Sequence, residues 1–413
     1  MQILSVLGPI RSILISVALL LLGNGLINTL LALRGTAEGF STPFLGLIMS
    51  GYFAGFICGS FAGRHLIRRM RHIRTFAFCA AICASAALLH LVFIDPWVWL
   101  GLRFVYGLSY ITLITVIESW LNSQAVPSER GRIFAIYMAV NLGALALAQQ
   151  ILRLGSTDGP LLFLLVSILI CWALLPITLT SKPEPEVSGR PRANLRALAS
   201  HAPLPVAAAL LSGLAMGAFW AMTPVYTVKL GLDNAGVALV MSLAIVGGAI
   251  FQIPVGRYSD RHDRPRVLNW IVLLAAGTAA LMPLAPSPEV LTGLYFLWGG
   301  LAFTLYPLSV AQMVDQLPRD EMVAGSSAML MLHGAGCALA PVLAGSLMGV
   351  LGIHALPIYI ALVLAGLGGF IFYRRRRVTD LTRGTAGHFE PMVQAGPESL
   401  DLAFEDQKPN ADT

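Results

Sequence analysis

A single arginine is embedded in an apolar stretch of the chain. Arg103 lies about six residues inside the apolar run 97–121. A charge near the middle of a membrane costs at least about 2.5–3.5 kcal/mol, so such a residue normally faces a partner or water. We expect Arg103 to contact a bound solute or to control a proton through a neighbouring acid. The alternative is that its long side chain reaches the outer headgroup region.

A dense group of charges separates two other apolar runs. The stretch PVGRYSDRHDRPR, residues 254–266, contains Asp260, Arg261 and Arg264, although only 12% of the chain is charged. Asp260 is suited to accept hydrogen bonds at the N-terminus of the run 322–350, because a helix N-terminus favours an anion by up to about 2 kcal/mol. Pairing of Asp260 with an arginine would complete a conformational latch. Arg64 is a candidate for the same latch, although the arginines of 64–74 are also typical of loops that anchor a chain on one side of a membrane.

Three further titratable residues lie inside or at the ends of apolar runs. Glu118 precedes the stretch PSERGR, so it either binds a proton or joins the latch by pairing with Arg130 or Arg132. Asp315, at the end of the run 289–313, invites the same latch interpretation. His333 could titrate near neutral pH and couple to protons, or stay neutral and hydrogen-bonded to a neighbour.

Polar and aromatic side chains recur near the middle of several apolar runs. They are suited to hold a small, partly apolar solute by stacking and a few hydrogen bonds. Tyr and Trp near helix ends also form interfacial belts, and Asn or Gln within a membrane helix often joins neighbouring helices. Both roles stay open for each member. The candidates are Asn24, Asn28, Tyr110, Asn141, Gln149, Gln150, Trp220, Tyr226, Tyr295, Trp298 and Tyr306.

The elements that must position these residues are long apolar segments. Hydrophobic residues make up 56% of the 413 positions, and the mean hydropathy is +0.75. A soluble domain of this length cannot bury so much apolar surface, so lipid is the expected solvent. The runs lack the alternation of a membrane barrel, which favours helices. We expect an all-α membrane protein with twelve transmembrane helices over 11–33, 44–63, 73–94, 97–121, 132–153, 160–179, 204–229, 236–256, 267–285, 289–313, 322–350 and 353–373.

Lys and Arg are distributed unevenly around these segments. If the N-terminus is cytoplasmic, all but four of the 27 Lys and Arg residues fall on the cytoplasmic side. Arg34, Arg153 and Lys229 fall on the other side, and Arg103 lies within a span. The positive-inside rule therefore predicts cytoplasmic N- and C-termini in a plasma membrane. The net charge of +6 belongs to short loops and not to one basic face, which argues against nucleic acid as a partner.

The twelve segments divide into two groups of six. The polar, proline-rich stretch TSKPEPEVSGRPRAN, residues 180–194, separates them. We expect an N-terminal six-helix bundle over 8–179 and a cytoplasmic linker over 180–203. A C-terminal bundle over 204–373 and a disordered cytoplasmic tail over 374–413 complete the chain.

The two groups also resemble each other in sequence. GLRFVYGLSYIT at 101–112 matches GLYFLWGGLAFT at 293–304, at an offset of 192. CGSFAGRH at 58–65 shares G-x-x-x-x-R-H with VGRYSDRH at 255–262, at an offset of 197, which places Gly63 opposite Asp260. Parallel repeats of this kind pack around an axis along the membrane normal, with the binding site between them near the midplane.

These features resemble the major facilitator superfamily over residues 8 to 375. GRYSDRHDRPR is similar to the family's loop signature G-x-x-x-D-R-x-G-R-R, with Asp263 where Gly is usual. RFVYG is similar to its fourth-span pattern, in which Gly follows four residues after Arg103. IESWLN followed by PSERGR further resembles a group of bacterial facilitators typified by YcaD. The resemblance implies two pseudo-symmetric bundles whose first, fourth, seventh and tenth spans line a cavity.

The expected function is secondary active transport of a small organic solute by alternating access, coupled to protons, with export favoured over uptake. An uptake symporter or uniporter is one alternative, and a membrane sensor or scaffold that does not transport is another. The sequence contains no P-loop, nucleophile elbow or zinc-binding histidine pair, so we expect no enzyme activity, catalytic residue, metal or cofactor. The expected partners are the solute, protons and the lipid bilayer of a bacterial inner membrane, with the monomer as the working unit.

Overall fold

The computed structural model describes residues 2–124, 129–179, 195–318 and 321–377. Within these ranges the chain is built from α-helices and short 3-10 turns. Twelve of the described segments are long and apolar enough to cross a membrane, which confirms the predicted number of spans. Several helices continue beyond the predicted limits, because a helix does not have to end where its apolar stretch ends.

The first six spans precede the separating polar stretch. The sixth span is divided between two helices. The bounds are α1 (Gln2–Ala37), α2 (Thr42–Met70), α3 (His72–Val92), α4 (Pro96–Gln124), α5 (Arg130–Ile151), α6 (Leu161–Trp172) and α7 (Leu174–Thr178).

The second six spans follow a short helix, α8 (Leu195–His201). The tenth span is divided between two helices. The bounds are α9 (Pro203–Lys229), α10 (Asn234–Arg261), α11 (Arg264–Leu281), α12 (Pro288–Ala302), α13 (Leu305–Val314), α14 (Met322–Leu351) and α15 (Ala355–Arg377). The predicted linker over 180–203 thus ends in α8, and its first fifteen residues, 180–194, lie outside the described residues. Most of the predicted tail, from 378 on, also lies outside them.

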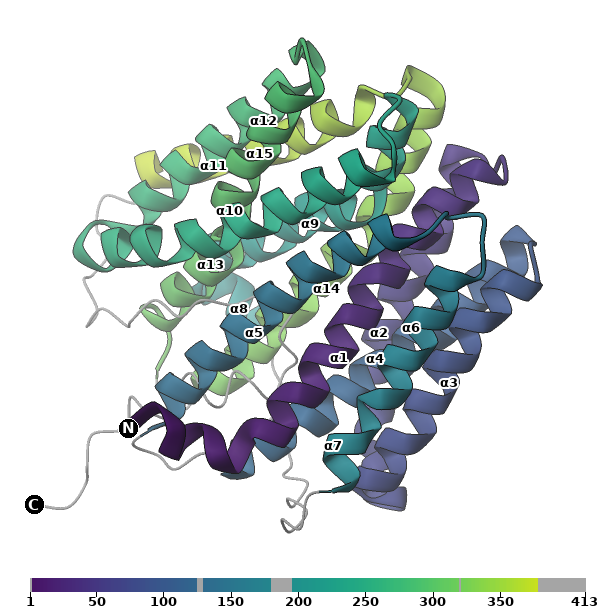
Figure 1. The fold of residues 1–413 in the computed structure, drawn as a ribbon. Coiled ribbons are helices and arrows are strands. Elements are labelled where there is room, and N and C mark those ends of the chain that lie inside the picture. Colours follow the sequence, from purple (N-terminus) through teal and green to yellow (C-terminus); the bar gives the residue numbers. More distant parts are fainter. Residues whose placement is uncertain (1, 125–128, 180–194, 319–320, 378–413) are drawn as a thin grey trace, which may run out of the picture.

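The two groups of six spans pack in the same pattern. In the first half, α1 packs against α5 and α6, and α4 packs against α2 and α3. In the second half, α9 packs against α14 and α15, and α12 packs against α10 and α11. Between the halves, α2 meets α14, α5 meets α10 and α1 meets α9, as a two-fold axis requires. Figure 1 shows the first half in purple to teal and the second in green to yellow, side by side.

Close helix crossings show which positions of the two halves are equivalent. A Cβ atom on Gly107 would collide with the carbonyl oxygen of Tyr52, so only glycine lets α2 and α4 approach this closely. A Cβ atom on Gly299 would collide in the same way with the carbonyl oxygen of Ala244. Gly107 and Gly299 are 192 residues apart, which is the offset predicted for the fourth and tenth spans.

The same offset holds where the second helix of each half ends. His72 begins α3 and Arg264 begins α11, which again differ by 192. The predicted offset of 197 for this region is therefore wrong. A shared short motif had shifted the alignment by five positions, and at the offset of 192 the equivalent of Asp260 is Arg68 and not Gly63.

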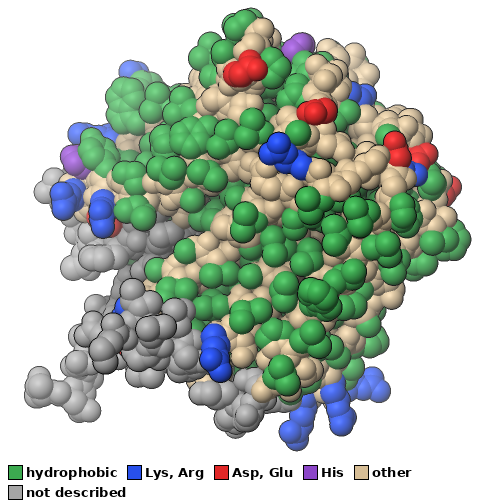
Figure 2. Space-filling model, viewed as in Figure 1, with side chains coloured by type: hydrophobic (Ala, Val, Ile, Leu, Met, Phe, Trp, Pro, Cys, Tyr) green, Lys and Arg blue, Asp and Glu red, His purple; other side chains and the backbone are tan. Residues whose placement is uncertain are grey.

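An apolar surface separates two charged ends of the bundle. Hydrophobic side chains cover the middle of the face in Figure 2, Lys and Arg gather at its lower and left edges, and most visible Asp and Glu lie toward the upper right. We call the end at which α2 ends and α3 begins the basic end, and the other end the opposite end. The arginines of the basic end include Arg64, Arg68, Arg69, Arg71, Arg74, Arg257, Arg261, Arg264 and Arg266.

Polar side chains join the two halves at the opposite end. Gln150 Nε2 on α5 donates to Ser242 Oγ on α10 at 2.7 Å and to the Ala238 carbonyl at 3.3 Å. Lys229 Nζ, at the end of α9, donates to Thr42 Oγ1 at the start of α2 at 2.7 Å. These bonds link helices that belong to different halves, so separation of the halves at this end must break them.

The backbones of α2 and α14 also meet at the opposite end. A Cβ atom on Gly46 would collide with the Pro341 carbonyl oxygen, and one on Gly345 would lie 2.7 Å from the Thr42 carbonyl oxygen. The crossing therefore depends on residues without side chains. In Figure 1, α5 and α10 lie close together at the opposite end and diverge toward the basic end.

Candidate functional site

Arg103 is held where α1, α2 and α4 meet in the first half. It lies on α4, four residues before Gly107, whose contact with the backbone of Tyr52 draws α2 onto α4. The close crossing places the ring of Tyr52 under the guanidinium group of Arg103, with 4.5 Å from Cζ to the ring centroid. The ring of Tyr106, one turn further along α4, lies 5.8 Å from the same atom.

The polar contacts of Arg103 are few. Its Nη2 donates to Asn28 Oδ1 on α1 at 2.6 Å and lies 3.9 Å from Met49 Sδ on α2. Its Nε and Nη1 atoms have no hydrogen-bond partner, and no carboxylate of the described residues forms an ion pair with it. The predicted control of a proton through a neighbouring acid therefore has no support among these contacts.

The side chain of Arg103 is almost completely buried, with 1% of its surface exposed. It turns into the first half, which excludes the alternative of extension to the headgroups. Removing a charged group from water costs several kcal/mol even after relaxation. A desolvated cation–π contact contributes about 2 kcal/mol and a hydrogen bond to a charged group about 1.5–3 kcal/mol. These contacts offset much of the cost but leave the positive charge unneutralised.

Other polar groups around Arg103 also lack partners. Asn24 lies one turn before Asn28 on α1, is fully buried, and forms no side-chain hydrogen bond. The hydroxyls of Tyr106 and Tyr110 are buried without partners, and their rings stack at 6.1 Å and 10°. Native proteins leave only a few such groups unsatisfied per hundred residues. Their concentration beside an unpaired charge identifies this region as a candidate binding site.

The second half carries an aromatic group at the equivalent place. Tyr295 occupies the position of Arg103, and Trp298 that of Tyr106, at the offset of 192. Phe219 of α9 packs against Trp298 at 5.1 Å and against Trp220 at 5.1 Å between ring centroids. Phe303 closes the group, 5.7 Å from Trp220. The two halves thus place a cation and a buried aromatic cluster at corresponding points, and the Tyr295 hydroxyl and the Trp298 indole N–H of this cluster have no hydrogen-bond partner.

His333 and Tyr306 form a second contact in this half. The imidazole of His333 on α14 lies 4.6 Å from the Tyr306 ring on α13. His333 Nδ1 also lies 3.2 Å from Ser212 Oγ on α9. The predicted candidates His333 and Tyr306 are therefore together, and the hydrogen-bonded alternative for His333 agrees with this geometry.

Three other predicted candidates lie elsewhere. Tyr226 is near the opposite end, where its hydroxyl lies 3.4 Å from His354 Nδ1. Asn141 donates to the Tyr137 carbonyl at 3.4 Å, one turn back on α5. Gln149 accepts from Thr29 Oγ1 at 2.7 Å and so joins α1 to α5 within the first half. The Gln149 bond agrees with the alternative that such side chains join neighbouring helices, whereas the Asn141 bond stays within α5.

Glu118 is a fully buried acid on α4. Its Oε1 accepts a hydrogen bond from the Tyr137 hydroxyl of α5 at 3.0 Å. Fifteen residues of α4 separate Glu118 from Arg103, which places them about 22 Å apart along the helix. The acid and the unpaired cation therefore occupy separate regions.

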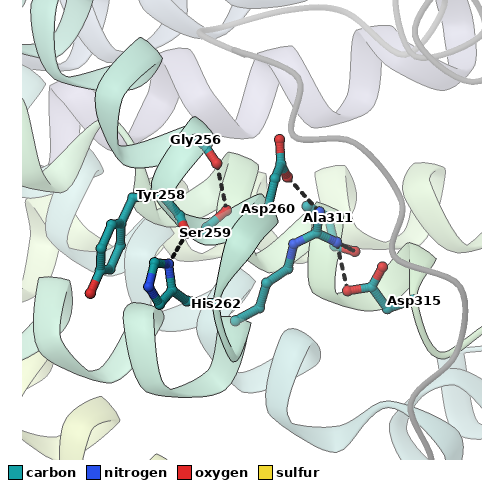
Figure 3. A network of polar contacts seen from close by, with 8 residues as sticks. Gly256, Tyr258, Ser259, Asp260, His262, Ala311 and Asp315 are labelled. Carbon is teal, nitrogen blue, oxygen red and sulfur yellow. Dashed lines mark hydrogen bonds and ion pairs between the residues drawn. The ribbon is translucent and has the colours of Figure 1, made fainter.

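A network of ion pairs fastens three helices at the basic end (Figure 3). Arg264 at the start of α11 donates to Asp260 Oδ1 of α10 at 2.7 Å and to Asp315 Oδ2, which follows α13, at 2.6 Å. It also donates to the Ala311 carbonyl at 3.1 Å. Asp263 caps α11, since its side chain accepts from the Arg266 backbone N–H at 3.0 Å. All of these residues belong to the second half.

The remaining latch candidates, apart from Glu118, lie on α2, on α5 and at the end of α10. Arg261 is exposed at the end of α10 and forms no ion pair with the described residues. Arg64 lies partly buried on α2, and Arg130 begins α5. The stretch 254–266 is mostly helical, so its first eight residues extend α10 and do not form a loop.

Several residues of these sites were not predicted from the sequence. Tyr106 lies three positions after Arg103, so helical periodicity alone places it on the same face. Tyr52 and Met49 come from a different helix, and Tyr137 reaches Glu118 from another. Only the packing of the helices identifies those three.

The fold and these sites agree with the family to which the chain belongs. The profile of the Major Facilitator Superfamily matches residues 13–248 and 205–395, so the chain is a member of this family of membrane transport proteins. It is accordingly a multi-pass membrane protein of twelve transmembrane helices arranged in two pseudo-symmetric bundles.

Similar proteins fall within the same family. The chain is 28% identical over 344 residues to the uncharacterized MFS-type transporter YcaD of Escherichia fergusonii, covering 82% of this chain and 89% of that protein. The identity to YcaD of Salmonella newport is 28% over 345 residues, with the same coverage.

Solved structures share the fold at low sequence identity. A mutant of the nucleoside transporter NupG superposes with a TM-score of 0.75 at 14% identity, covering 88% of this chain and 99% of that one. A bacterial homolog of the human lysosomal transporter Spinster, inward-facing and occupied, superposes with a TM-score of 0.74 at 13% identity, covering 89% and 96%.

Proposed function

We propose that this chain is a secondary active transporter that moves a small organic solute by alternating access between its two halves. The supporting observation is that the opposite end is held closed by contacts between the halves. Gln150 with Ser242 and Lys229 with Thr42 are bonds that one half makes to the other. A binding site between the halves becomes accessible from this side only when these bonds break.

Cross-linking tests this proposal directly. In a background in which all five cysteines are replaced, Gln150→Cys and Ser242→Cys introduce thiols on the two sides of the interface. A ligand is first identified by thermal shift against metabolites and drugs, because saturation at 100 times the Kd adds about 2.7 kcal/mol to the folded state. Closing the pair with a short thiol-reactive cross-linker should abolish transport of that ligand in proteoliposomes, and a cleavable linker should restore it.

Gln149, the residue next to Gln150, supplies a matched control. Thr29→Cys and Gln149→Cys join α1 to α5 inside the first half, across a bond of the same 2.7 Å length. This cross-link should leave transport unchanged because it does not cross the interface. If the protein cross-linked between Gln150→Cys and Ser242→Cys transports the ligand as fast as the uncross-linked protein, alternating access is contradicted. A ligand that binds but never crosses the sealed bilayer identifies a sensor or scaffold.

We also propose that transport is coupled to protons through Glu118 or His333. Glu118 is fully buried and hydrogen-bonded to Tyr137, and His333 lies between Tyr306 and Ser212. Pyranine trapped in proteoliposomes reports proton movement when the ligand is added. Glu118→Gln and His333→Gln are then compared. The variant that still transports the ligand but no longer moves protons identifies the residue that carries the proton. When the ligand enters the vesicles, alkalinisation of the interior indicates antiport and therefore export in the cell. Acidification of the interior indicates symport and therefore uptake, and no pH response indicates a uniporter.

The proposed setting is a bacterial inner membrane with both termini in the cytoplasm and a single chain as the working unit. The concentration of arginines at the basic end supports this orientation. Labelling of single cysteines at positions 153 and 266 with an impermeant reagent in intact cells tests it. Reaction at 153 and protection at 266 are expected, and the reverse pattern inverts the topology.

A further inference from the structure

We propose that the transported solute is an organic anion and that Arg103 binds its carboxylate group. This inference rests on the proposed transport function, whose substrate class it specifies. The site consists of Arg103 with Asn24 and Asn28 of α1, Tyr52 of α2, and Tyr106 and Tyr110 of α4.

The charge balance of the two buried arginines favours an anion at Arg103. Arg103 and Arg264 are the two arginines that are buried within the described residues, at 1% and 5% exposure. Arg264 is neutralised by Asp260 and Asp315, whereas no carboxylate of the described chain pairs with Arg103. Water could satisfy unpaired N–H groups, but it does not neutralise a charge in a medium of low dielectric constant. An anion supplied by the solute would do both.

Several hydrogen-bond donors around Arg103 are available to a solute. Nε and Nη1 of Arg103 and the hydroxyls of Tyr106 and Tyr110 are buried without partners. The amide of Asn24 offers one more donor and one acceptor, also without partners. A carboxylate has two oxygens that each accept more than one hydrogen bond, and it pairs well with a guanidinium group.

The net charge of the site favours a carboxylate over a phosphate group. The site contains one cation, and the equivalent position of the second half holds Tyr295 and not a basic residue. A single positive charge matches a monoanion, while a phosphate carries between one and two negative charges at neutral pH. The aromatic residues of the second half, including Trp298 and Phe219, suit the apolar remainder of such a solute.

The packing of α1 and α2 gives a solute a route to the site. Asn28 lies on α1, which packs against α9, and Tyr52 lies on α2, which packs against α14. Two of the three helices that carry the site, α1 and α2, therefore also form the interface between the halves. Relative movement of the halves exposes or covers these helices, so the anion can be taken up and released during the transport cycle.

The experiment is a thermal-shift titration of the purified wild-type protein with paired probes. Each small carboxylate, such as benzoate, is compared with its neutral amide, here benzamide, and sodium chloride and sodium phosphate are titrated as inorganic anions. At least one carboxylate should stabilise the protein saturably, and its amide should bind about 100-fold more weakly, as expected for the loss of one charge-assisted hydrogen-bonded pair. No saturable effect is expected for chloride or phosphate.

Variants assign the effect to one residue. Arg103→Gln should weaken carboxylate binding about 100-fold and leave amide binding unchanged. Arg153→Gln removes the same charge from an exposed position near the opposite end and should leave both unchanged. The wild-type comparison decides the proposal even when Arg103→Gln does not fold. Equal binding of amides, saturable binding of chloride or phosphate in preference to carboxylates, unaltered binding by a folded Arg103→Gln, or no binding by any carboxylate overturns it.

Flux measurements separate this inference from the proposed function. A carboxylate that binds through Arg103 but does not cross a sealed bilayer supports the anion site and contradicts transport. A neutral solute that crosses the bilayer, with no carboxylate bound, supports transport and contradicts the anion site.

Discussion

Two buried arginines, one in each half of the molecule, are stabilised in different ways. Arg264 lies at the basic end between Asp260 and Asp315, and both ion pairs are 2.7 Å or shorter. Arg103 lies deep in α4 against two tyrosine rings and one amide oxygen. The chain thus neutralises one buried charge with its own carboxylates, whereas no carboxylate of the described residues pairs with the other. The first arrangement serves structure, and the second is suited to binding.

Replacement of Arg264 should have the largest effect on stability. Arg264→Ala leaves two neighbouring carboxylates without their cation, so the free energy of unfolding should fall by about 3–5 kcal/mol. Chemical denaturation in detergent measures the change. Arg266→Ala removes an exposed arginine whose Nε lies 3.4 Å from Asp263, and it should cost less than about 1 kcal/mol. Equal losses in the two variants would show that the buried network adds nothing to an ordinary surface pair.

Replacement of Arg103 should separate stability from transport. Arg103→Met fills the site with an apolar side chain and removes an unneutralised charge, so the free energy of unfolding should stay within about 1 kcal/mol of wild type or rise. Transport of the ligand should fall about 100-fold, because the charge that binds the solute is lost. Arg103→Lys, which retains the charge but not the planar group, should lie between. A parallel loss of stability would make Arg103 a structural brace like Arg264.

The aromatic support of Arg103 should contribute less. Tyr52→Leu removes the ring under the guanidinium group, whereas Tyr52→Phe keeps it. The two variants should differ by about 1–2 kcal/mol in the free energy of unfolding, which is the range of a desolvated cation–π contact. Thermal unfolding of both proteins provides the comparison. Equal stabilities would leave Asn28 as the main support of the charge.

The smallest effects are expected for the two partners of Arg264. Asp260→Asn and Asp315→Asn each leave one carboxylate on Arg264, so each should cost about 1 kcal/mol or less. A second measurement, the thiol labelling of Gln150→Cys at the opposite end, shows whether these carboxylates stabilise only the second half or also hold the two halves together. If Asp260 also holds the halves together at the basic end, Asp260→Asn favours closure of the opposite end and lowers this labelling, and Asp315→Asn does not. Identical labelling in both variants limits the network to the second half.

The sequence predicted the overall architecture because the physics of a membrane is simple. A helix must be apolar for about 20 residues to cross the hydrocarbon, and that signal was present twelve times. The ends of the helices were predicted less well. α2 continues to Met70 and α10 to Arg261, since a helix extends into water without any requirement for apolar residues.

The candidate sites were predicted only where one residue carried the signal. Arg103 was identifiable because a charge within an apolar run needs a reason. Its stacking on Tyr52 depends on how α2 crosses α4, and the pair of Arg264 with Asp315 joins residues 51 positions apart. Contacts of this kind follow from how the helices pack, and the pattern of a single sequence does not predict that packing. The misplaced equivalence of Asp260 and Gly63 has a different origin, because there a short shared motif shifted the alignment by five positions.

The glycine contact between α2 and α14 also limits how far apart the two halves can lie at the opposite end. Gly46 touches the backbone of Pro341, and Gly345 touches that of Thr42, so the two helices meet without intervening side chains. A methyl group at Gly46 would collide with the Pro341 carbonyl oxygen and push the two helices apart. An alanine at this position would therefore act as a permanent spacer between the halves.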